Sequence, residues 1–342
     1  MDKKIVQLGN YKFSGIDASL VGAIKSVSDY YQIPLSTSWI YGMTGIAFLH
    51  ILDESLVEPN GGPPEPEVFR LARNFGVEVQ GLHVYAEDEQ FLDLQLEAWE
   101  KAKLAMNAEQ PVFAKNLDIE NQTTVIIAYD DDGYYTHSWH TGYEHCDDVV
   151  PWRSLGRSLC PCINCVNDRS SSHPNNAVGG LISLHWATRI QPIDELTALK
   201  EALRFVIRLN EEEDYTSLGK RYSVGSKAYE RWISALESND VDKYFFSLFI
   251  EVLNEARTYA IMFLAELKGR NLGIGEQIIN EGINLYTVVA SKFKILRDMY
   301  PYTEPHESEL HHKEECIALV KELYQLERDC FHYIKKFHAS IP

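Results

Sequence analysis

The sequence predicts an α+β domain over residues 1–192, followed by an all-helical domain over residues 193–342. Helical and strand patterns are mixed in the first part. After Asp194, apolar residues recur at spacings of three and four, without strand signals. A chain of 342 residues is also long enough for two domains that each bury a hydrophobic core. We therefore expect the domain boundary near residues 190–195.

The first domain begins with two helical patterns. Residues 14–31 carry apolar side chains at helical spacing, and residues 39–51 predict a second apolar helix that contains Gly42 and Gly45. The segment 58–66 (EPNGGPPEP) predicts a loop, because proline and glycine interrupt it throughout. A helical pattern resumes at Glu67, directly after this loop.

Strand signals follow in the rest of the first domain. An amphipathic helix is predicted over residues 92–104, and the turn DDDG at residues 130–133 is a strong hairpin signal. Short runs rich in β-branched and aromatic residues predict strands at residues 77–79, 111–113, 123–129, 134–137 and 178–190. Helices followed by strands are typical of an α+β domain.

The second domain shows helical periodicity only. Its predicted helices cover residues 194–209, 226–237, 241–268, 273–300 and 307–339. Gly219, Gly225, Gly269 and Pro301 mark the breaks between them. Amphipathic helices of these lengths, joined by short connections, predict a helical bundle.

Composition excludes several classes of partner. The chain has 32 basic and 50 acidic residues, so its formal charge is 32 − 50 = −18, which argues against nucleic acid and against an anionic membrane surface. No apolar run reaches about 18 residues, and we expect a soluble, cytoplasmic protein. Six cysteines in a chain of this length do not form a disulfide scaffold, which leaves reduced thiols or metal ligands. The sequence does not indicate an oligomeric state.

Several segments resemble a known family. Residues 19–31 (SLVGAIKSVSDYY) and 39–48 (WIYGMTGIAF) are similar to the opening of butirosin-biosynthesis-protein-H-like proteins, which are relatives of the C39-like, papain-fold cysteine peptidases. Residues 124–131 (TVIIAYDD) resemble the strand before a Tyr-Asp turn in that fold. In the helical half, residues 225–229, Trp232, Asn254, Arg257 and residues 263–264 resemble the C-terminal bundle of the family. The resemblance implies a papain-like (C39-like) first domain.

The sequence departs from this family at the positions that carry its chemistry. Ser19 falls where the family has its nucleophilic cysteine, and Gln122 falls where a C39-like peptidase has its histidine. A serine hydroxyl needs an adjacent base before it attacks a carbonyl, and a glutamine amide takes no proton at neutral pH. We therefore expect a degenerate member that binds a small molecule, a peptide or an acyl-carrier protein in a natural-product or peptide pathway, without turnover and without a required cofactor.

An active alternative uses the same serine. His137 or His140 follows the predicted hairpin turn, and either of them beside Ser19 would make a serine-dependent acyltransferase or amide hydrolase. On a regular strand these two histidines point to opposite faces, so only one of them can line the pocket. Asp17 would orient that histidine or cap the helix. The structural alternative for Ser19 is a hydroxyl that bonds a free backbone N–H at the helix start.

A second group of residues has the spacing of metal ligands. Cys162 and Cys165 form a C-x-x-C pair, with Cys160 and His145 in the preceding residues. Zinc takes four nitrogen or sulfur ligands, and this spacing is usual for half of such a site. The segment therefore predicts either a structural zinc, which would make the chain a zinc-stabilised protein-interaction module, or a surface loop with unligated thiols.

The expected ligand-binding residues come from both domains. Asp17, Trp39 and Gln122 accompany Ser19, and Asn254 and Arg257 belong to the helical domain. The last two lie three residues apart on one helical face within an apolar run. Arg257 either binds a carboxylate or phosphate of the ligand, or pairs with an acidic residue of a neighbouring helix.

Overall fold

The computed structural model describes residues 4–58, 63–119, 121–139, 141–142, 147–159, 179–270, 272–302 and 310–342. The chain forms two compact units. Unit 1 consists of Met1–Leu35 and Gly76–Gln191, and unit 2 consists of Ser36–Phe75 and Pro192–Pro342. Helices and an antiparallel sheet are both present, which confirms the predicted α+β class.

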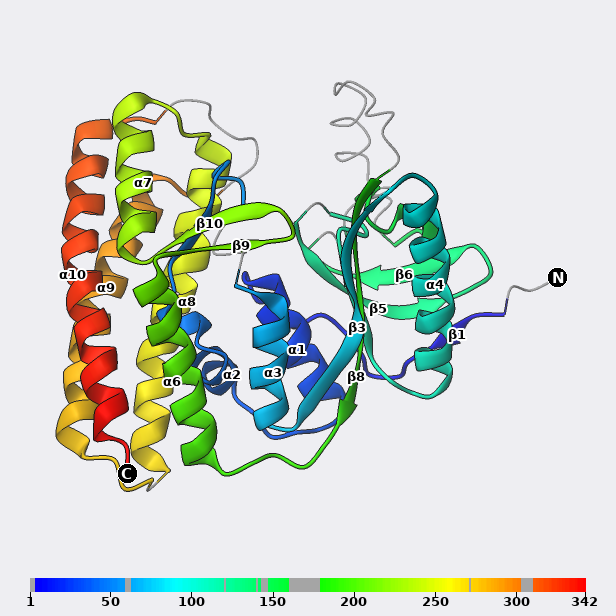
Figure 1. Cartoon of the computed structure of the whole chain (residues 1–342), viewed down its shortest axis with the longest axis horizontal. Helices are drawn as coiled ribbons and strands as arrows, with labels where there is room; N and C mark the ends of the chain where they lie inside the picture. The colour runs from blue at the N-terminus through cyan, green and yellow to red at the C-terminus, as the bar shows by residue number, and fades with distance from the viewer. Residues whose placement is uncertain are drawn as a thin grey trace. The chain divides into compact units, whose positions relative to one another are not determined.

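Unit 1 is built on an antiparallel sheet (Figure 1). Its strands lie in the order β3-β8-β4-β5-β6-β7, and β1 pairs with β5. The strands are Val6–Gln7 (β1), Val77–Glu87 (β3), Val112–Lys115 (β4), Thr123–Tyr129 (β5), Gly133–His137 (β6), Val150–Pro151 (β7) and Gly179–Arg189 (β8). The two longest, β3 and β8, pair along their whole length.

The predicted hairpin is present between β5 and β6, and Asp130 forms its turn. One carboxylate oxygen of Asp130 accepts hydrogen bonds from the backbone N–H groups of Asp132, at 2.8 Å, and Gly133, at 3.2 Å. The other accepts from the hydroxyl of Tyr135 at 2.9 Å. An aspartate that bonds the backbone two residues later is a common turn former, which explains why this hairpin is visible in the sequence.

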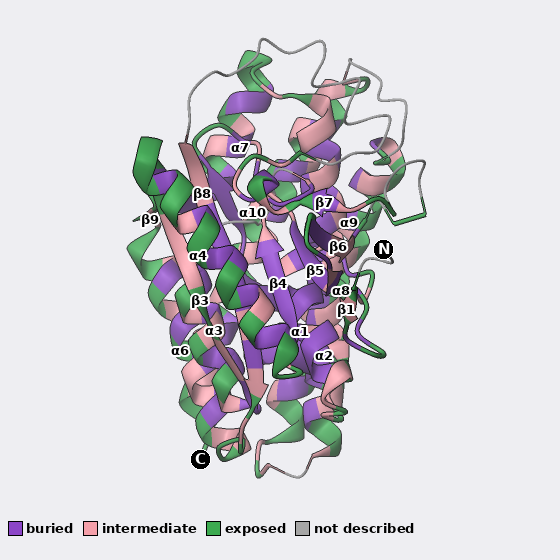
Figure 2. Ribbon diagram, turned by 90° about the vertical axis from the view of Figure 1, so that its right-hand side faces the viewer, coloured by how far each residue is buried: buried purple, intermediate pink, exposed green. Residues whose placement is uncertain are grey.

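Two helices cover opposite faces of this sheet (Figure 1): α1 (Ser19–Tyr30) and α4 (Asp88–Asn107). The apolar residues of α1 at helical spacing, Val21, Ile24 and Val27 among them, are fully buried. Figure 2 shows α1 and the central strands β4 and β5 as largely buried. A 3-10 turn, η2 (Trp152–Ser154), follows β7. Burial of this apolar stripe anchors α1 to the sheet and places Ser19 next to β5.

Unit 2 is mainly helical, but it also contains a small sheet. Its helices are α2 (Thr37–Met43), η1 (Ile46–Phe48), α3 (Glu65–Asn74), α6 (Glu195–Glu212), α7 (Ser226–Ser238), α8 (Lys243–Gly269), α9 (Glu276–Met299) and α10 (Lys313–Ser340). The strands β2 (Ile51–Asp53), β10 (Lys220–Val224) and β9 (Asp214–Ser217) form an antiparallel sheet in that order. The predicted all-helical second domain is therefore wrong in this detail. The sequence gives no strand signal after Asp194 because β9 and β10 are short and largely polar.

The boundary predicted near residues 190–195 is present at Gln191, but the segment Ser36–Phe75 belongs to unit 2 and not to the first domain. Two contacts show how this segment is held. The hydroxyl of Ser38 donates to Glu266 at 3.0 Å, and the ring of Trp39 lies 5.4 Å from that of Phe263. Such contacts join residues more than 200 positions apart, so local periodicity does not reveal them.

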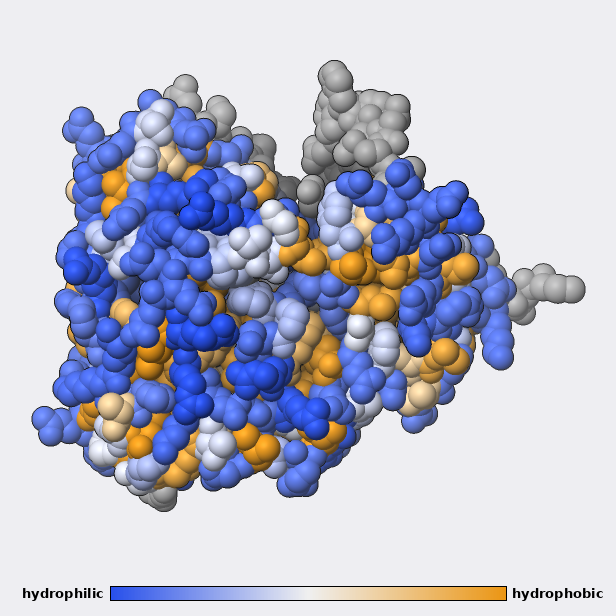
Figure 3. Space-filling model, in the orientation of Figure 1, coloured by the Kyte–Doolittle hydropathy of each residue, from blue (hydrophilic) through white to orange (hydrophobic). Residues whose placement is uncertain are grey.

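Hydrophilic residues cover most of the face shown in Figure 3, as expected for a chain with 50 acidic and 32 basic residues. Among the described helices, none combines the length and the apolar character needed to cross a bilayer.

A substitution at Gly42 would test how the segment Ser36–Phe75 packs within unit 2. A β-carbon at this position would lie 2.2 Å from the nearest ring carbon of Phe263. Because a packed core resists added volume, we expect Gly42→Ala to lower the free energy of unfolding by about 2 kcal/mol, measured by urea denaturation. Gly269→Ala is the matched control, since a β-carbon added there would meet nothing within 4 Å, and it should be close to neutral. Equal effects of the two substitutions would contradict this packing.

Candidate functional site

Unit 2 encloses a cavity with a volume of about 90 Å³. A single water needs only about 10–15 Å³ of such space, so the cavity has room for several waters or a small organic ligand. Five of its lining residues are aromatic, Phe48, Tyr229, Tyr286, Tyr324 and Phe331, and more of the lining surface is polar than apolar. These rings come from η1, α7, α9 and α10, so residues from both sequence segments of unit 2 build the pocket.

His50 is the polar residue in this wall that most needs a partner. Its side chain is buried, and neither Nδ1 nor Nε2 has a hydrogen-bond partner among the described residues. The ring packs edge-on against Tyr229, with centroids 4.3 Å apart, and against Trp232 at 5.4 Å. Buried polar atoms are normally hydrogen-bonded, so an unpaired imidazole in a cavity wall points to a bound group.

The backbone of unit 2 fixes the position of His50. Its carbonyl accepts a hydrogen bond from the backbone N–H of Gly225 at 2.9 Å, and the β2 strand begins at the next residue. Burial, together with the positive charge of Arg257, holds the pKa of His50 well below its usual value. The imidazole is therefore neutral at pH 7 and offers one N–H donor and one nitrogen acceptor.

Arg257 holds the segment before His50 in place. Its side chain is fully buried, and Nη1 donates to the carbonyls of Ala47 at 2.9 Å and Leu49 at 3.0 Å. Its Nε donates to the Glu327 carboxylate at 2.5 Å. An ion pair with an acid of another helix, one of the two predicted roles of Arg257, is therefore present. Glu327 lines the cavity, and the positive charge of Arg257 compensates the negative charge of its carboxylate.

Tyr229 adds a second unpaired polar group to the wall. The residue is 1% exposed, and its hydroxyl has no hydrogen-bond partner in the described part of the chain. Burial and the nearby Glu327 charge raise the pKa of Tyr229 well above its usual value, so the hydroxyl stays protonated. It can therefore donate one hydrogen bond and accept another.

Three charged residues line the cavity, and they differ in how far they are buried. Glu327 is 11% exposed, whereas Glu213 and Arg328 are exposed. The Arg328 guanidinium lies 5.8 Å from the ring centre of Tyr324. Among the described residues, the buried part of the wall therefore combines aromatic faces, a neutral histidine and one carboxylate, with no cation. Such a surface suits a ligand that is positively charged or neutral.

The predicted nucleophile lies in unit 1. Ser19 begins α1, and its Oγ accepts a hydrogen bond from the backbone N–H of Thr123 at 3.0 Å. His137, at the end of β6, accepts a hydrogen bond at Nδ1 from the backbone N–H of Phe13 at 3.3 Å. Burial and the charge of Lys12 lower the pKa of His137. Ser19 and His137 thus both accept hydrogen bonds from backbone N–H groups. The N–H that Ser19 binds belongs to β5, whereas the structural alternative expected an N–H at the start of its own helix.

The predicted ligand-binding residues do not form one group. Asp17 and Gln122 are half-buried in unit 1. Trp39 is buried in unit 2, where the Arg270 guanidinium lies 3.6 Å from its ring centre. Asn254 is half-buried on α8 and is not part of the cavity wall. Of this set, Arg257 is bonded to a residue of the wall, Glu327.

The expected zinc site falls outside the described residues. This applies to His145, Cys160, Cys162 and Cys165, and also to His140. Two cysteines of α10 are described, and both are buried free thiols. Burial raises the pKa of Cys316 to about 11 and raises that of Cys330 further, so both stay protonated.

Sequence reasoning missed His50 and Glu327. A signal for His50 exists, because it is the one polar residue in the apolar run IAFLHIL at residues 46–52. Glu327 lies in a helix with many charged residues, and nothing in the sequence distinguishes it from them. Tyr229 lies in the segment 225–229, which resembles the family's C-terminal bundle, but it was not among the expected ligand-binding residues.

No model of a known protein family matches this sequence, and no curated protein matches it with significance. The assignment of a function therefore depends on the geometry of the cavity and on the contacts of its wall.

The lowered pKa of His50 predicts a dependence of stability on pH. In the unfolded chain this histidine takes up a proton near pH 6.5, whereas in the folded chain it stays neutral. Stability is therefore lost as the pH falls below about 6.5. We expect the free energy of unfolding to fall more steeply between pH 7.5 and 5.5 in the wild type than in His50→Gln, by up to about 1.4 kcal/mol per pH unit.

Urea denaturation at a series of pH values measures this difference. The pKa values of His137 and His338 are also lowered, but both residues are present in the two proteins, so their contributions cancel in the comparison. Parallel pH profiles for wild type and variant would show that His50 is not buried in its neutral form.

Proposed function

We propose that this protein binds a small molecule carrying a protonated amine in the unit 2 cavity, and that it does so without turnover. The observation that supports the proposal is the pair of buried, unpaired polar groups on His50 and Tyr229, two residues that line a cavity of about 90 Å³ together with Glu327. Leaving such groups unpaired costs about 1–3 kcal/mol each, and a ligand would recover that cost.

The wall favours an amine over an acid. A ligand carboxylate would lie near the Glu327 carboxylate, while Nε and Nη1 of Arg257 are already bonded to Glu327 and to backbone carbonyls. Nη2 of Arg257 has no partner among the described residues, but Arg257 is not one of the residues that line the cavity. An ammonium group would instead meet aromatic faces, the Glu327 carboxylate and the acceptor nitrogen of His50. Attraction between a cation and an aromatic face is worth about 0.5–2 kcal/mol and increases as water is excluded.

The contacts of the candidate nucleophiles support binding without chemistry. Ser19 Oγ and His137 Nδ1 both accept hydrogen bonds from backbone N–H groups, an arrangement that serves structure. In the cavity wall, neither ring nitrogen of His50 has a hydrogen-bond partner among the described residues, so His50 makes no hydrogen bond to the hydroxyl of Ser226. A serine without an adjacent base is a weak nucleophile.

The family resemblance is consistent with this proposal. Within it, unit 1 is a papain-like domain in which Ser19 and Gln122 replace the reactive cysteine and histidine. The packing of α1 against an antiparallel sheet, with Ser19 at the helix start, is the arrangement that such a domain would retain. The function then belongs to the pocket of unit 2, and a peptide or acyl-carrier partner would present the ligand.

Three probes of matched size test the charge preference. Butylamine, butanol and butyrate share one alkyl chain and carry a cation, a neutral group and an anion. We expect ligand-observed NMR to detect butylamine binding in the millimolar range, weaker binding of butanol and none of butyrate, because only the amine satisfies the carboxylate and the aromatic wall. Tyr229→Phe should weaken butylamine binding at least fivefold by removing one hydroxyl.

Tyr85→Phe is the matched control, because Tyr85 is exposed on unit 1 and its variant should bind as the wild type does. Tighter binding of butyrate than of butylamine would overturn the charge preference. Equal binding by the Tyr229 and Tyr85 variants would place the ligand outside this cavity.

Incubation with panels of acyl thioesters and peptides tests the absence of turnover. We expect no multiple turnover from the wild type, and Ser19→Ala should behave identically because Ser19 Oγ accepts a backbone hydrogen bond. Multiple turnovers that Ser19→Ala abolishes would instead establish the serine-dependent acyltransferase or hydrolase.

A further inference from the structure

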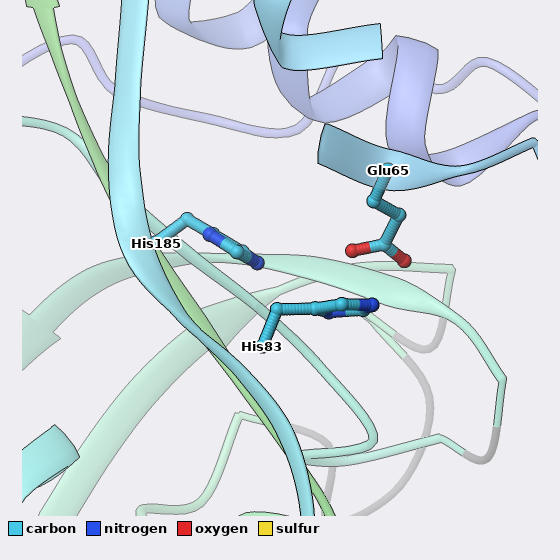
Figure 4. A group of neighbouring side chains, drawn as sticks. All are labelled: Glu65, His83 and His185. Carbon is cyan, nitrogen blue, oxygen red and sulfur yellow. The ribbon is translucent and has the colours of Figure 1, made fainter. Parts of the chain in front are cut away.

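Two histidines of unit 1, His83 and His185, lie on adjacent strands (Figure 4), and the serine Ser183 lies close to both of them. His83 of β3 is directly opposite Ser183 of β8, and His185 is two residues further along β8. Residues two apart on a strand point to the same face, so all three side chains share one face of the sheet. Figure 4 shows both imidazoles extending toward the same side; the third side chain drawn, Glu65, belongs to unit 2.

The serine hydroxyl orients both rings. Ser183 Oγ lies 3.1 Å from His83 Nδ1 and 3.1 Å from His185 Nε2. Ser183 is fully buried, His185 is 4% exposed and His83 is half-buried. A hydrogen bond to one nitrogen of an imidazole is the usual way in which a protein orients a metal-binding histidine and selects its tautomer.

The sheet leaves room for the His185 ring at this point. Gly81 lies opposite His185 in the register, and a β-carbon there would be 2.4 Å from His185 Nδ1. On the neighbouring strand β4, the ring of Phe113 lies 5.3 Å from that of His185. The glycine and the aromatic ring therefore define the position of His185, so little entropy remains to be lost when it binds a ligand.

We propose that His83 and His185 bind a zinc ion. One nitrogen of each ring lies within 4.8 Å of the other. Two nitrogens on a tetrahedral zinc, each about 2.0–2.1 Å from the metal, are roughly 3.3 Å apart. Binding of the ion would bring the two nitrogens to this separation. Neutral imidazole is a preferred ligand of zinc, and water or an oxygen ligand fills the remaining positions.

This site is independent of the unit 2 cavity and of the predicted cysteine site. It uses residues of β3 and β8 only, whereas the cavity belongs to unit 2. His83 and Ser183 lie 100 positions apart in the sequence, which explains why no local motif indicates the site.

Zinc titration of the full-length, chelator-treated protein tests the proposal. We expect isothermal titration calorimetry at pH 7.5 to detect a site in the wild type whose affinity falls at least about tenfold in His83→Gln and in His185→Gln. Ser183→Ala, which removes only the orienting hydroxyl, should weaken binding by a smaller factor. His332→Gln is the matched control, because His332 is exposed on α10, and its affinity should equal that of the wild type.

Cobalt substitution gives a second readout, since imidazole ligands change the visible absorption of bound Co²⁺ and the two histidine variants should lose that change. His83→Gln is the decisive variant, because its half-buried position makes loss of folding less of a concern, and circular dichroism checks this. Wild-type protein that binds no zinc would overturn the proposal. Unchanged zinc affinity in both histidine variants would also overturn it and place the metal elsewhere, for example at the cysteines.

Discussion

The structure of unit 2 depends on the buried guanidinium of Arg257. A charge inside a protein is stable only when hydrogen bonds and an opposite charge replace the water it has lost. Nη1 of Arg257 donates to two backbone carbonyls from the segment 47–49 and Nε donates to the carboxylate of Glu327, while Nη2 has no partner among the described residues. Arg257 of α8 thereby fixes both the backbone before His50 and the carboxylate of Glu327 on α10. His50 and Glu327 are two of the polar residues that line the cavity.

This arrangement explains the neutral state of His50. Burial and the fixed charge of Arg257 both disfavour protonation, so the ring keeps one acceptor nitrogen. The unpaired imidazole and the unpaired hydroxyl of Tyr229 are the kind of local cost that a protein retains where it binds something. In unit 1, by contrast, the side chains of the two candidate catalytic residues, Ser19 and His137, accept backbone hydrogen bonds.

The sequence predicted features that are encoded locally. The DDDG turn, the strand near residues 178–190 and the helices after residue 194 all follow from short-range patterns, and the structure contains them. It did not predict that the segment Ser36–Phe75 packs in unit 2, because this depends on contacts across more than 200 residues. The pocket was missed for the same reason: a buried arginine in an apolar helix predicts an acidic partner, but it does not identify Glu327, 70 positions away. His50, a lone histidine within an apolar run, was the available clue.

The proposed function requires His50 to be a neutral, buried imidazole that faces a ligand. The most direct test is the side-chain ¹⁵N spectrum of His50, assigned with His50→Gln, at pH 7 with and without butylamine. We predict the nitrogen shifts of a neutral ring with a single tautomer, and a change in those shifts on adding butylamine that exposed His332 does not share. A His50 ring that is protonated near neutral pH, or one that butylamine leaves unchanged, would contradict this role.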